Sequence, residues 1–204
     1  MKRGEVEKIE QEYIRNGTTG LIASRNVSST GEILAPLIQP TRTEIDFAEH
    51  IKGIIDLSPN SKYIFVMDQL NTHKSESLVR LIAQRCDLDE TDLGIKDKSG
   101  ILKNMDTRAA FLTDKSHDIR IVYTPKHSSW LNQIEIWFSI ITRRFLNKRQ
   151  VSNRWKNLKR GFDYLLSFTM NIWQNRSNGH MLENYCKHNA NYWLTTYLRS
   201  FALG

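Results

Sequence analysis

The chain has 204 residues with 40% hydrophobic content, and its 29 Lys or Arg outnumber its 22 Asp or Glu, for a net charge of +7. This length suits one core with a tail, and the absence of any run of about 18 apolar residues excludes a membrane span. The basic start of the chain is not followed by the apolar stretch of a secretory signal. Cys86 and Cys186 fit free thiols in a reducing compartment, so we expect a cytoplasmic protein.

Residues 1–16 form a polar segment without a clear apolar face. The runs 18–27 and 32–38 predict the two strands of a β-hairpin, because a Ser-Ser-Thr-Gly turn separates them. A helix follows, with Thr43 as its cap and Asp46 three residues later in a partial capping box. Its expected buried stripe consists of Phe47, Ile51, Ile54 and Ile55.

The uninterrupted apolar run 63–67 predicts a strand buried on both faces, and 75–86 predicts the next helix. Residues 87–117 are polar, and we interpret them as an insertion with one short helix around 108–112. After this insertion, residues 118–124 predict another strand.

A long helix is expected over 129–147, capped by Ser129, and a further helix over 158–174. Strands that alternate with helices after a hairpin indicate an α/β domain with a mixed sheet. We predict one such domain over 17–168. The C-terminal tail, residues 169–204, carries only a loose helical pattern, which leaves its structure open.

Two carboxylates stand next to apolar elements. Asp68 directly follows the first buried strand, and Glu135 lies beside the apolar stripe of the long helix. Carboxylates in such places are costly unless they are paired, hydrogen-bonded or bound to a cation. Brought together at the carboxyl end of a sheet, they would form an oxygen-rich site suited to Mg²⁺ or Mn²⁺. The alternative is structural: Asp68 caps the following loop, and Glu135 pairs with Arg143 or Lys126.

Positive charge is concentrated in residues 126–160, where nine Lys or Arg accompany a single acid, Glu135. Basic residues interleaved with aromatic ones are typical of a nucleic-acid partner, and a solvated helix face is the alternative. The residues that we expect to bind DNA are Lys126, His127, Arg143, Arg144, Lys148 and Arg149.

Four stretches match a known family: residues 12–18, 40–47, 68–75 (DQLNTHKS) and 129–138 (SWLNQIEIWF), of which the last two are the specific signals. Through them the chain resembles the DDE transposases of the IS630/Tc1/mariner superfamily. The resemblance implies a ribonuclease H-like α/β fold, with a mixed sheet flanked by helices. It also implies cleavage and strand transfer of DNA with Mg²⁺ or Mn²⁺ as the cofactor.

The resemblance assigns roles to individual residues. Asp68 corresponds to the second catalytic acid and Glu135 to the third, both as metal ligands. His73 and Asn132 correspond to neighbours that support the site. The expected partners are transposon ends, target DNA and further copies of the chain, without a membrane.

One part of the family pattern is missing. In the family, the first catalytic Asp lies on a strand that precedes the hairpin and forms the centre of the sheet. This chain has no Asp before Asp46 and no strand-like run before residue 18. We interpret it as the C-terminal portion of a truncated transposase, which lacks the first, central strand and leaves strand edges unpaired. We expect impaired catalysis.

Whether the chain is an enzyme stays open at this point. One alternative is a non-catalytic DNA-binding or regulatory remnant of a transposase. Another is a ribonuclease H-like nuclease of cellular function, which would use Glu10 or Glu12 as its third acid.

Overall fold

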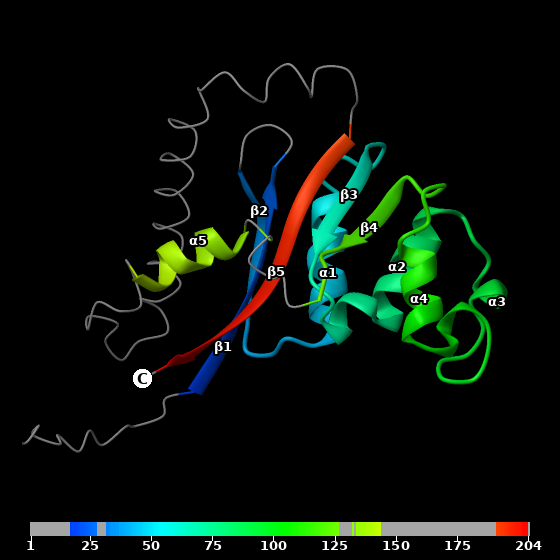
Figure 1. Cartoon of the computed structure of the whole chain (residues 1–204), viewed down its shortest axis with the longest axis horizontal. Helices are drawn as coiled ribbons and strands as arrows, with labels where there is room; N and C mark the ends of the chain where they lie inside the picture. Colours follow the sequence, from blue (N-terminus) through cyan, green and yellow to red (C-terminus); the bar gives the residue numbers. More distant parts are fainter. Residues whose placement is uncertain (1–16, 28–31, 127–131, 133, 144–190, 204) are drawn as a thin grey trace, which may run out of the picture.

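The computed structural model describes residues 17–27, 32–126, 132, 134–143 and 191–203 (Figure 1). Its elements, in chain order, are β1 (Gly17–Asn26), β2 (Ile33–Gln39), α1 (Glu44–Ile55), β3 (Lys62–Met67), the 3₁₀ turn η1 (Asn71–Lys74), α2 (Glu76–Arg85), α3 (Glu90–Leu93), the 3₁₀ turn η2 (Ile101–Lys103), α4 (Met105–Leu112), β4 (Ile119–Tyr123), α5 (Ile134–Ile141) and β5 (Asn191–Leu203).

The strands form one mixed five-stranded sheet in the order β2-β1-β5-β3-β4. β1 and β2 pair antiparallel, with Gly20 opposite Gln39 and a register shift between Ile22 and Ser24. β3 and β4 pair in parallel. The central strand, β5, runs antiparallel to β1 and parallel to β3, and Figure 1 shows it as the long diagonal strand between them.

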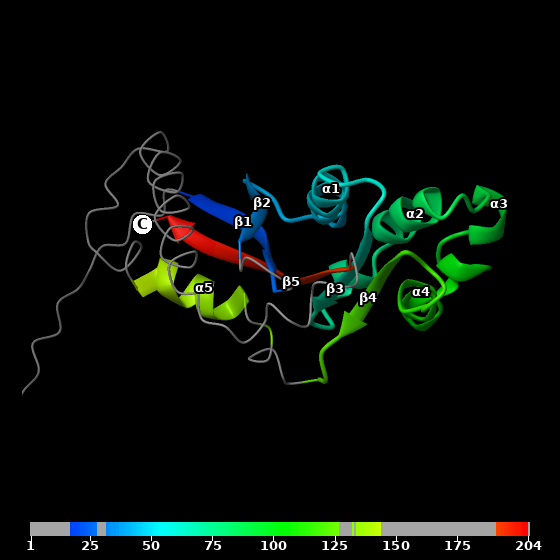
Figure 2. The same cartoon turned by 90° about the horizontal axis from the view of Figure 1, so that it is seen from above.

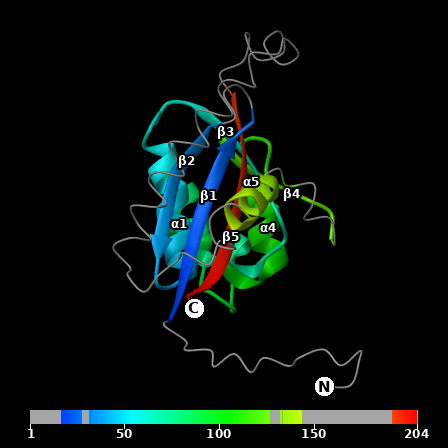
Figure 3. The ribbon, with the colours of Figure 1, turned by 90° about the vertical axis from the view of Figure 1, so that its left-hand side faces the viewer.

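Helices cover both faces of this sheet. α1 packs against β1 and β2, and α5 packs against β1 and β5. The two views in Figures 2 and 3 place α1 and α5 on opposite sides of the β1–β5 pair. α2 packs beside α1 and α4 beside α2, and side chains from these helices meet those of β3 and β4 in one hydrophobic core.

The predicted helix after the hairpin is confirmed, together with its cap. Asp46 N–H donates to Thr43 Oγ1 over 3.2 Å, and Thr43 N–H donates to Asp46 Oδ2 over 2.7 Å. This capping box satisfies backbone donors at the start of α1. The four residues of the predicted stripe are all fully buried: Phe47, Ile51, Ile54 and Ile55.

The predicted strand, helix and strand around the insertion are also confirmed, as β3, α2 and β4. Ser75 caps α2 by accepting a hydrogen bond from Leu78 N–H over 3.3 Å. In β3, Tyr63, Phe65 and Met67 are almost completely buried. This apolar strand determines where Asp68, the next residue along the chain, leaves the sheet.

Residues 87–117 are more ordered than the sequence predicted. They contain α3 and η2 in addition to α4, which is the one helix expected there. Leu93, Leu102 and Leu112 from this segment are fully buried in the main core. The three leucines are too far apart for one helical stripe, so the sequence pattern did not reveal them as core residues.

The centre of the sheet is the largest departure from the predictions. The sequence predicted that the central strand is missing and that neighbouring strand edges are unpaired. Instead, β5 occupies the centre and pairs with β1 from Gly17 to Asn26 and with β3 from Lys62 to Met67. The prediction of unpaired central edges is therefore wrong for the described residues. Aromatic and β-branched residues such as Trp193, Thr195 and Tyr197 favour a strand here, although the tail was interpreted as loosely helical.

The predicted long helix begins later than expected. Among the described residues, its first helical residue is Ile134, and Asn132 is not helical. Ser129 itself lies outside the described residues, as does the helix predicted over 158–174. None of the helices in the described part of the chain has the length and apolar character needed to cross a lipid bilayer.

Candidate active site

Asp68 lies at the carboxyl end of β3, where the strand leaves the sheet. Its carboxylate Oδ1 is 2.8 Å from His73 Nδ1 and accepts a hydrogen bond from Leu70 N–H over 3.2 Å. The structural alternative predicted that Asp68 caps the loop 71–75, whereas its backbone donor is Leu70, the residue just before that loop. The bond to His73 goes beyond loop capping, because it joins the carboxylate to a buried ring.

His73 is completely buried, while the Asp68 side chain keeps 21% of its surface exposed. The imidazole ring packs on the Phe47 ring, with centroids 4.5 Å apart, and Nδ1 also lies 3.1 Å from the Asp68 carbonyl oxygen. Because both neighbours of Nδ1 are acceptor oxygens of Asp68, Nδ1 is protonated and donates to them. This bond holds the Asp68 side chain in one orientation. Nε2 is buried and has no hydrogen-bond partner among the described residues.

The ionisation of Asp68 follows from these contacts. Burial raises the pKa of its carboxyl, but the hydrogen bond and charge of His73 and the Leu70 N–H outweigh burial, so the pKa lies below the ordinary value. At neutral pH, Asp68 is an anion whose Oδ1 is engaged and whose Oδ2 accepts no hydrogen bond within the described part of the chain. A fixed carboxylate with one open oxygen is suited to binding a hard cation.

The loop after β3 is fastened to the end of β4. Tyr123 Oη donates to His73 O over 2.8 Å, and Gln69 Nε2 donates to Thr124 O over 3.1 Å. Burial raises the pKa of Tyr123, which keeps its hydroxyl protonated as the donor. The Lys74 ammonium lies 4.9 Å from the centre of the Tyr123 ring. These contacts hold His73 and Asp68 on a rigid support.

Glu135 lies in the first turn of α5, which covers the face of the sheet opposite α1 (Figure 2), and Asn132 lies two residues before this helix begins. Asn132 is completely buried, and its carbonyl accepts a hydrogen bond from Glu135 N–H over 3.0 Å. Glu135 itself is partly buried, between the buried Ile134 and the half-exposed Ile136. α5 packs against β1 and β5, whereas Asp68 ends β3.

The structure thus joins the Asp68 side chain to His73, and it joins Asn132 to Glu135 through a backbone hydrogen bond. Within the described residues, no three His, Cys, Asp or Glu side chains gather as a ready cation site. The chemistry of the donors still fits a divalent metal, because Asp68 offers an ionised oxygen and Glu135 is a second carboxylate.

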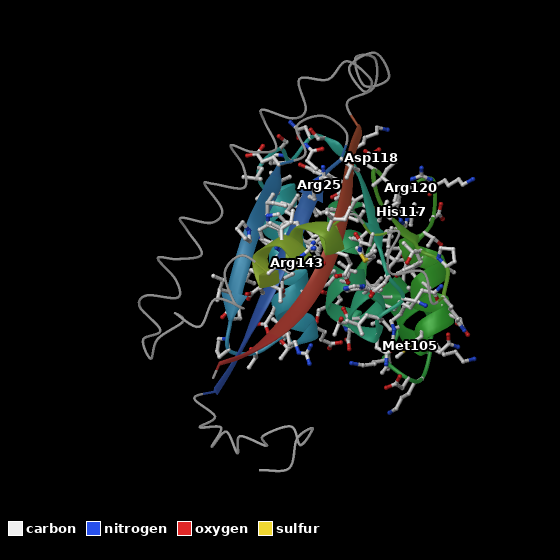
Figure 4. All side chains as sticks on the ribbon, turned by 60° about the vertical axis from the view of Figure 1, so that its left-hand side comes forward. Arg25, Met105, His117, Asp118, Arg120 and Arg143 are labelled. Carbon is white, nitrogen blue, oxygen red and sulfur yellow. The ribbon has the colours of Figure 1, made fainter. Side chains whose placement is uncertain are left out.

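The predicted DNA-binding residues are described only in part. Lys126 is exposed just after β4, and Arg143, labelled in Figure 4, is exposed just after α5. Arg143 Nε donates to Ser139 O over 3.2 Å. His127, Arg144, Lys148 and Arg149 lie outside the described residues.

Sequence analysis missed a second buried histidine. His50 Nε2 lies 2.8 Å from Ser24 Oγ on β1, and Nδ1 lies 2.8 Å from the Ala35 carbonyl oxygen on β2. Burial lowers the pKa of His50 to about 4, so the ring is neutral at physiological pH. A signal was present, because His50 follows Phe47 by three residues and precedes Ile54 by four, on the apolar stripe of α1.

The chain was compared with known proteins. A family model described as DDE superfamily endonuclease matches residues 1–158. No curated protein and no solved structure matches the chain.

Proposed function

Because the chain belongs to the DDE superfamily endonucleases, we propose that it contains the catalytic domain of a DNA transposase of the IS630/Tc1/mariner type. In this proposal, such a domain cuts and rejoins DNA phosphodiesters at transposon ends and target DNA. The observation that carries the proposal is the ionised Asp68 at the carboxyl end of β3, held by the buried His73.

The sheet supports a ribonuclease H-like arrangement. A hairpin lies on one side of the central strand and the parallel pair β3 and β4 on the other. Asp68 then ends the strand next to the central one, as the resemblance implies for the second catalytic acid. α5 carries Glu135 over the β1–β5 pair, on the face opposite α1. The place of Asp68 after β3 supports its proposed role, whereas the role of Glu135 rests on the resemblance.

We assign the metal to Asp68 and Glu135, with Mg²⁺ or Mn²⁺ as the ion. Such an ion supplies Lewis-acid activation of the attacking hydroxyl or water and neutralises charge at the phosphodiester. His73 keeps the Asp68 carboxylate in one rotamer through Nδ1, which leaves Oδ2 for the ion. Asn132 supports Glu135 at the start of α5. Lys126 and Arg143 are exposed cations that bind DNA phosphates in this proposal.

Catalysis by this chain is proposed to be weak. The central strand of the family carries the first catalytic acid, but β5 has the sequence NYWLTTYLRSFAL, without Asp or Glu. Thr196 pairs with Met67, so Tyr197 follows at the level of Asp68. Two carboxylates bind two cations less well than three do, because less negative charge offsets the loss of the ions' hydration.

The same observation favours a second candidate function. A chain that binds DNA and lacks an acid on its central strand would act as a non-catalytic or regulatory relative of a transposase. It would occupy transposon ends, or assemble with an intact transposase, without cutting.

A plasmid-nicking assay with Mg²⁺ or Mn²⁺ distinguishes these functions. The proposal expects weak nicking that disappears in Asp68→Ala and in Glu135→Ala. The matched control is Glu49→Ala, which removes an exposed acid of α1 and leaves nicking unchanged. Metal-independent DNA binding without any nicking would instead support the regulatory candidate. Nicking that survives both alanine variants would overturn the assignment of the two acids.

A further inference from the structure

A cavity lined by positively charged side chains lies at the end of β3 opposite Asp68. The amino ends of β3 and β4 border this cavity of about 340 Å³. Its lining residues are Lys62, Tyr63, Ile64, Lys115, Ser116, His117, Asp118 and Arg120. At a rise of about 3.3 Å per residue, the six-residue strand β3 separates the cavity from Asp68 by about 20 Å. The cavity is therefore distinct from the candidate active site.

Short segments from two strands and a turn build this cavity. Tyr63 N–H donates to the Asp118 carbonyl over 2.8 Å, which ties the start of β3 to the start of β4. In the turn before β4, Asp114 Oδ1 accepts hydrogen bonds from the Ser116 N–H and hydroxyl, both over 2.8 Å. Lys115 and Ser116 are thereby presented from an ordered turn.

The charge of the cavity is positive. Lys62, Lys115 and Arg120 face one lining anion, Asp118, which leaves a net of two positive charges. Asp118 pairs with Lys62 over 2.7 Å, and both side chains are largely exposed, so this pair is weak. Within the described part of the chain, Lys115 and Arg120 make no ion pair.

His117 anchors the turn beside the cavity. His117 Nδ1 is buried and has no hydrogen-bond partner among the described residues. The ring packs against Phe111, with centroids 4.6 Å apart, so its position is set by the core side of the turn. Figure 4 shows His117, Asp118 and Arg120 gathered at one end of β4. The packed ring holds the turn that carries Lys115 at the edge of the cavity, where Arg120 of β4 also lies.

We propose that this cavity binds phosphate groups of a DNA backbone, as a second contact away from the candidate active site. Lys115 and Arg120 provide the positive charge that attracts the phosphate oxygens. Because phosphates repeat along the strand, DNA bound at Asp68 can reach a site about 20 Å away within roughly six base pairs. The inference rests on the proposed function in taking DNA as the ligand, although it assigns a different site.

The test measures the affinity of the full chain for a fluorescent DNA duplex of arbitrary sequence, by anisotropy at several salt concentrations. In Lys115→Gln/Arg120→Gln we expect about tenfold weaker binding at low salt. The slope of the logarithm of the binding constant against the logarithm of the salt concentration should also be smaller in magnitude by about two. The charge-matched control is Lys98→Gln/Lys103→Gln, which changes two exposed lysines that do not line the cavity. Met105, two residues after Lys103, lies well away from His117 and Arg120 in Figure 4. Equal affinities for these two variants would overturn the proposal.

Two further measurements keep the result interpretable. Lys115→Gln alone changes an exposed turn residue and should lower the slope by about one, even where the double variant folds poorly. Titration with pyrophosphate checks for a smaller ligand: a heat signal lost in the double variant, with DNA affinity unchanged, would overturn the nucleic-acid assignment. Asp68 does not line the cavity, so the nicking assay tests the proposed function and the DNA-binding assay tests the cavity. Failure of one assay therefore does not imply failure of the other.

Discussion

The Nδ1 atom of His73 lies 2.8 Å from the Asp68 carboxylate, and the histidine ring is completely buried. A buried ring that is packed on Phe47 cannot rotate away, so it fixes the carboxylate at the end of β3. The orientation of the proposed metal ligand is therefore decided by the core of the protein and not only by the loop that carries it.

This relationship predicts different results for two amide substitutions of His73. Asn places its amide nitrogen close to the position of Nδ1, whereas Gln places it near Nε2, so His73→Asn should keep more of the bond to Asp68. His73→Ala should lower the free energy of unfolding by about 2–4 kcal/mol, because it leaves a cavity and an unpaired carboxylate. Urea denaturation measures all three. Equal losses for Asn and Gln would show that the contact with Asp68 does not matter for stability.

The contact between Asp68 and His73 also predicts how the free energy of unfolding changes at acidic pH. The folded-state pKa of Asp68 is lowered, so its contribution to stability is complete above the unfolded pKa and is lost as the pH falls through the folded pKa. His73→Gln should reduce this acid-side loss. Unfolding free energies of both chains across acidic pH provide the comparison, and identical pH profiles would contradict the coupling.

The buried His50 predicts a separate change in the free energy of unfolding, between pH 6.5 and about 4. Its pKa is lowered from 6.5 to about 4, so the folded state resists protonation that the unfolded chain accepts. Stability from this group is complete above pH 6.5 and decreases as the pH falls toward 4, by roughly 3 kcal/mol in total. In His50→Gln this decrease should be absent. The difference between the two chains is the quantity to measure, because shared carboxylates cancel in it; a constant difference would refute the prediction.

The central position of β5 predicts that backbone amides near the C-terminal end of the chain are strongly protected from hydrogen exchange. A central strand donates and accepts hydrogen bonds on both edges, so the amides of residues 191–203 that pair with β1 and β3 should exchange as slowly as those of residues 62–67. Hydrogen exchange read by mass spectrometry compares the two peptides. Rapid exchange across 191–203 would exclude β5 from the sheet.

A single substitution tests the same strand. Leu194 pairs with Phe65 on one side and Asn26 on the other. Leu194→Pro removes a backbone donor from the middle of the sheet and should destabilise the protein by about 3 kcal/mol or more. Thermal unfolding monitored by circular dichroism measures the effect, with Leu194→Val as the control that keeps the donor.

Gly94 predicts a local effect in the segment between α2 and β4. Its φ is +75°, and a Cβ there would lie 2.3 Å from the Ser99 carbonyl oxygen. Gly94→Ala should therefore destabilise the protein by about 1–3 kcal/mol, through backbone strain and the clash. Gly53→Ala is the control, because a Cβ at Gly53 meets only ordinary contact, 3.9 Å from Ala35 Cβ. A smaller loss at Gly94 than at Gly53 would contradict this account.

The amino-acid sequence by itself determined the elements whose signals are local. The capping box at Thr43, the apolar run of β3 and the helix predicted over 75–86 depend on residues within a few positions of one another, and each is found in the structure. The position of Asp68 at the end of β3 follows from the same local pattern. The resemblance to DDE enzymes rests on such short motifs too, and the family match agrees with it.

Tertiary structure alone decided which distant segments meet. β5 joins β1 and β3 across more than a hundred residues of chain, and nothing near Trp193 in the sequence indicates which strands it pairs with. Likewise, His73 becomes a fixed partner of Asp68 only because Phe47 and Tyr123 enclose it. The cavity between Lys62, Lys115 and Arg120 arises from the parallel register of β3 and β4. Hydrogen bonding between strands is satisfied by backbone groups that every residue carries, so the partners are chosen by packing of the whole chain.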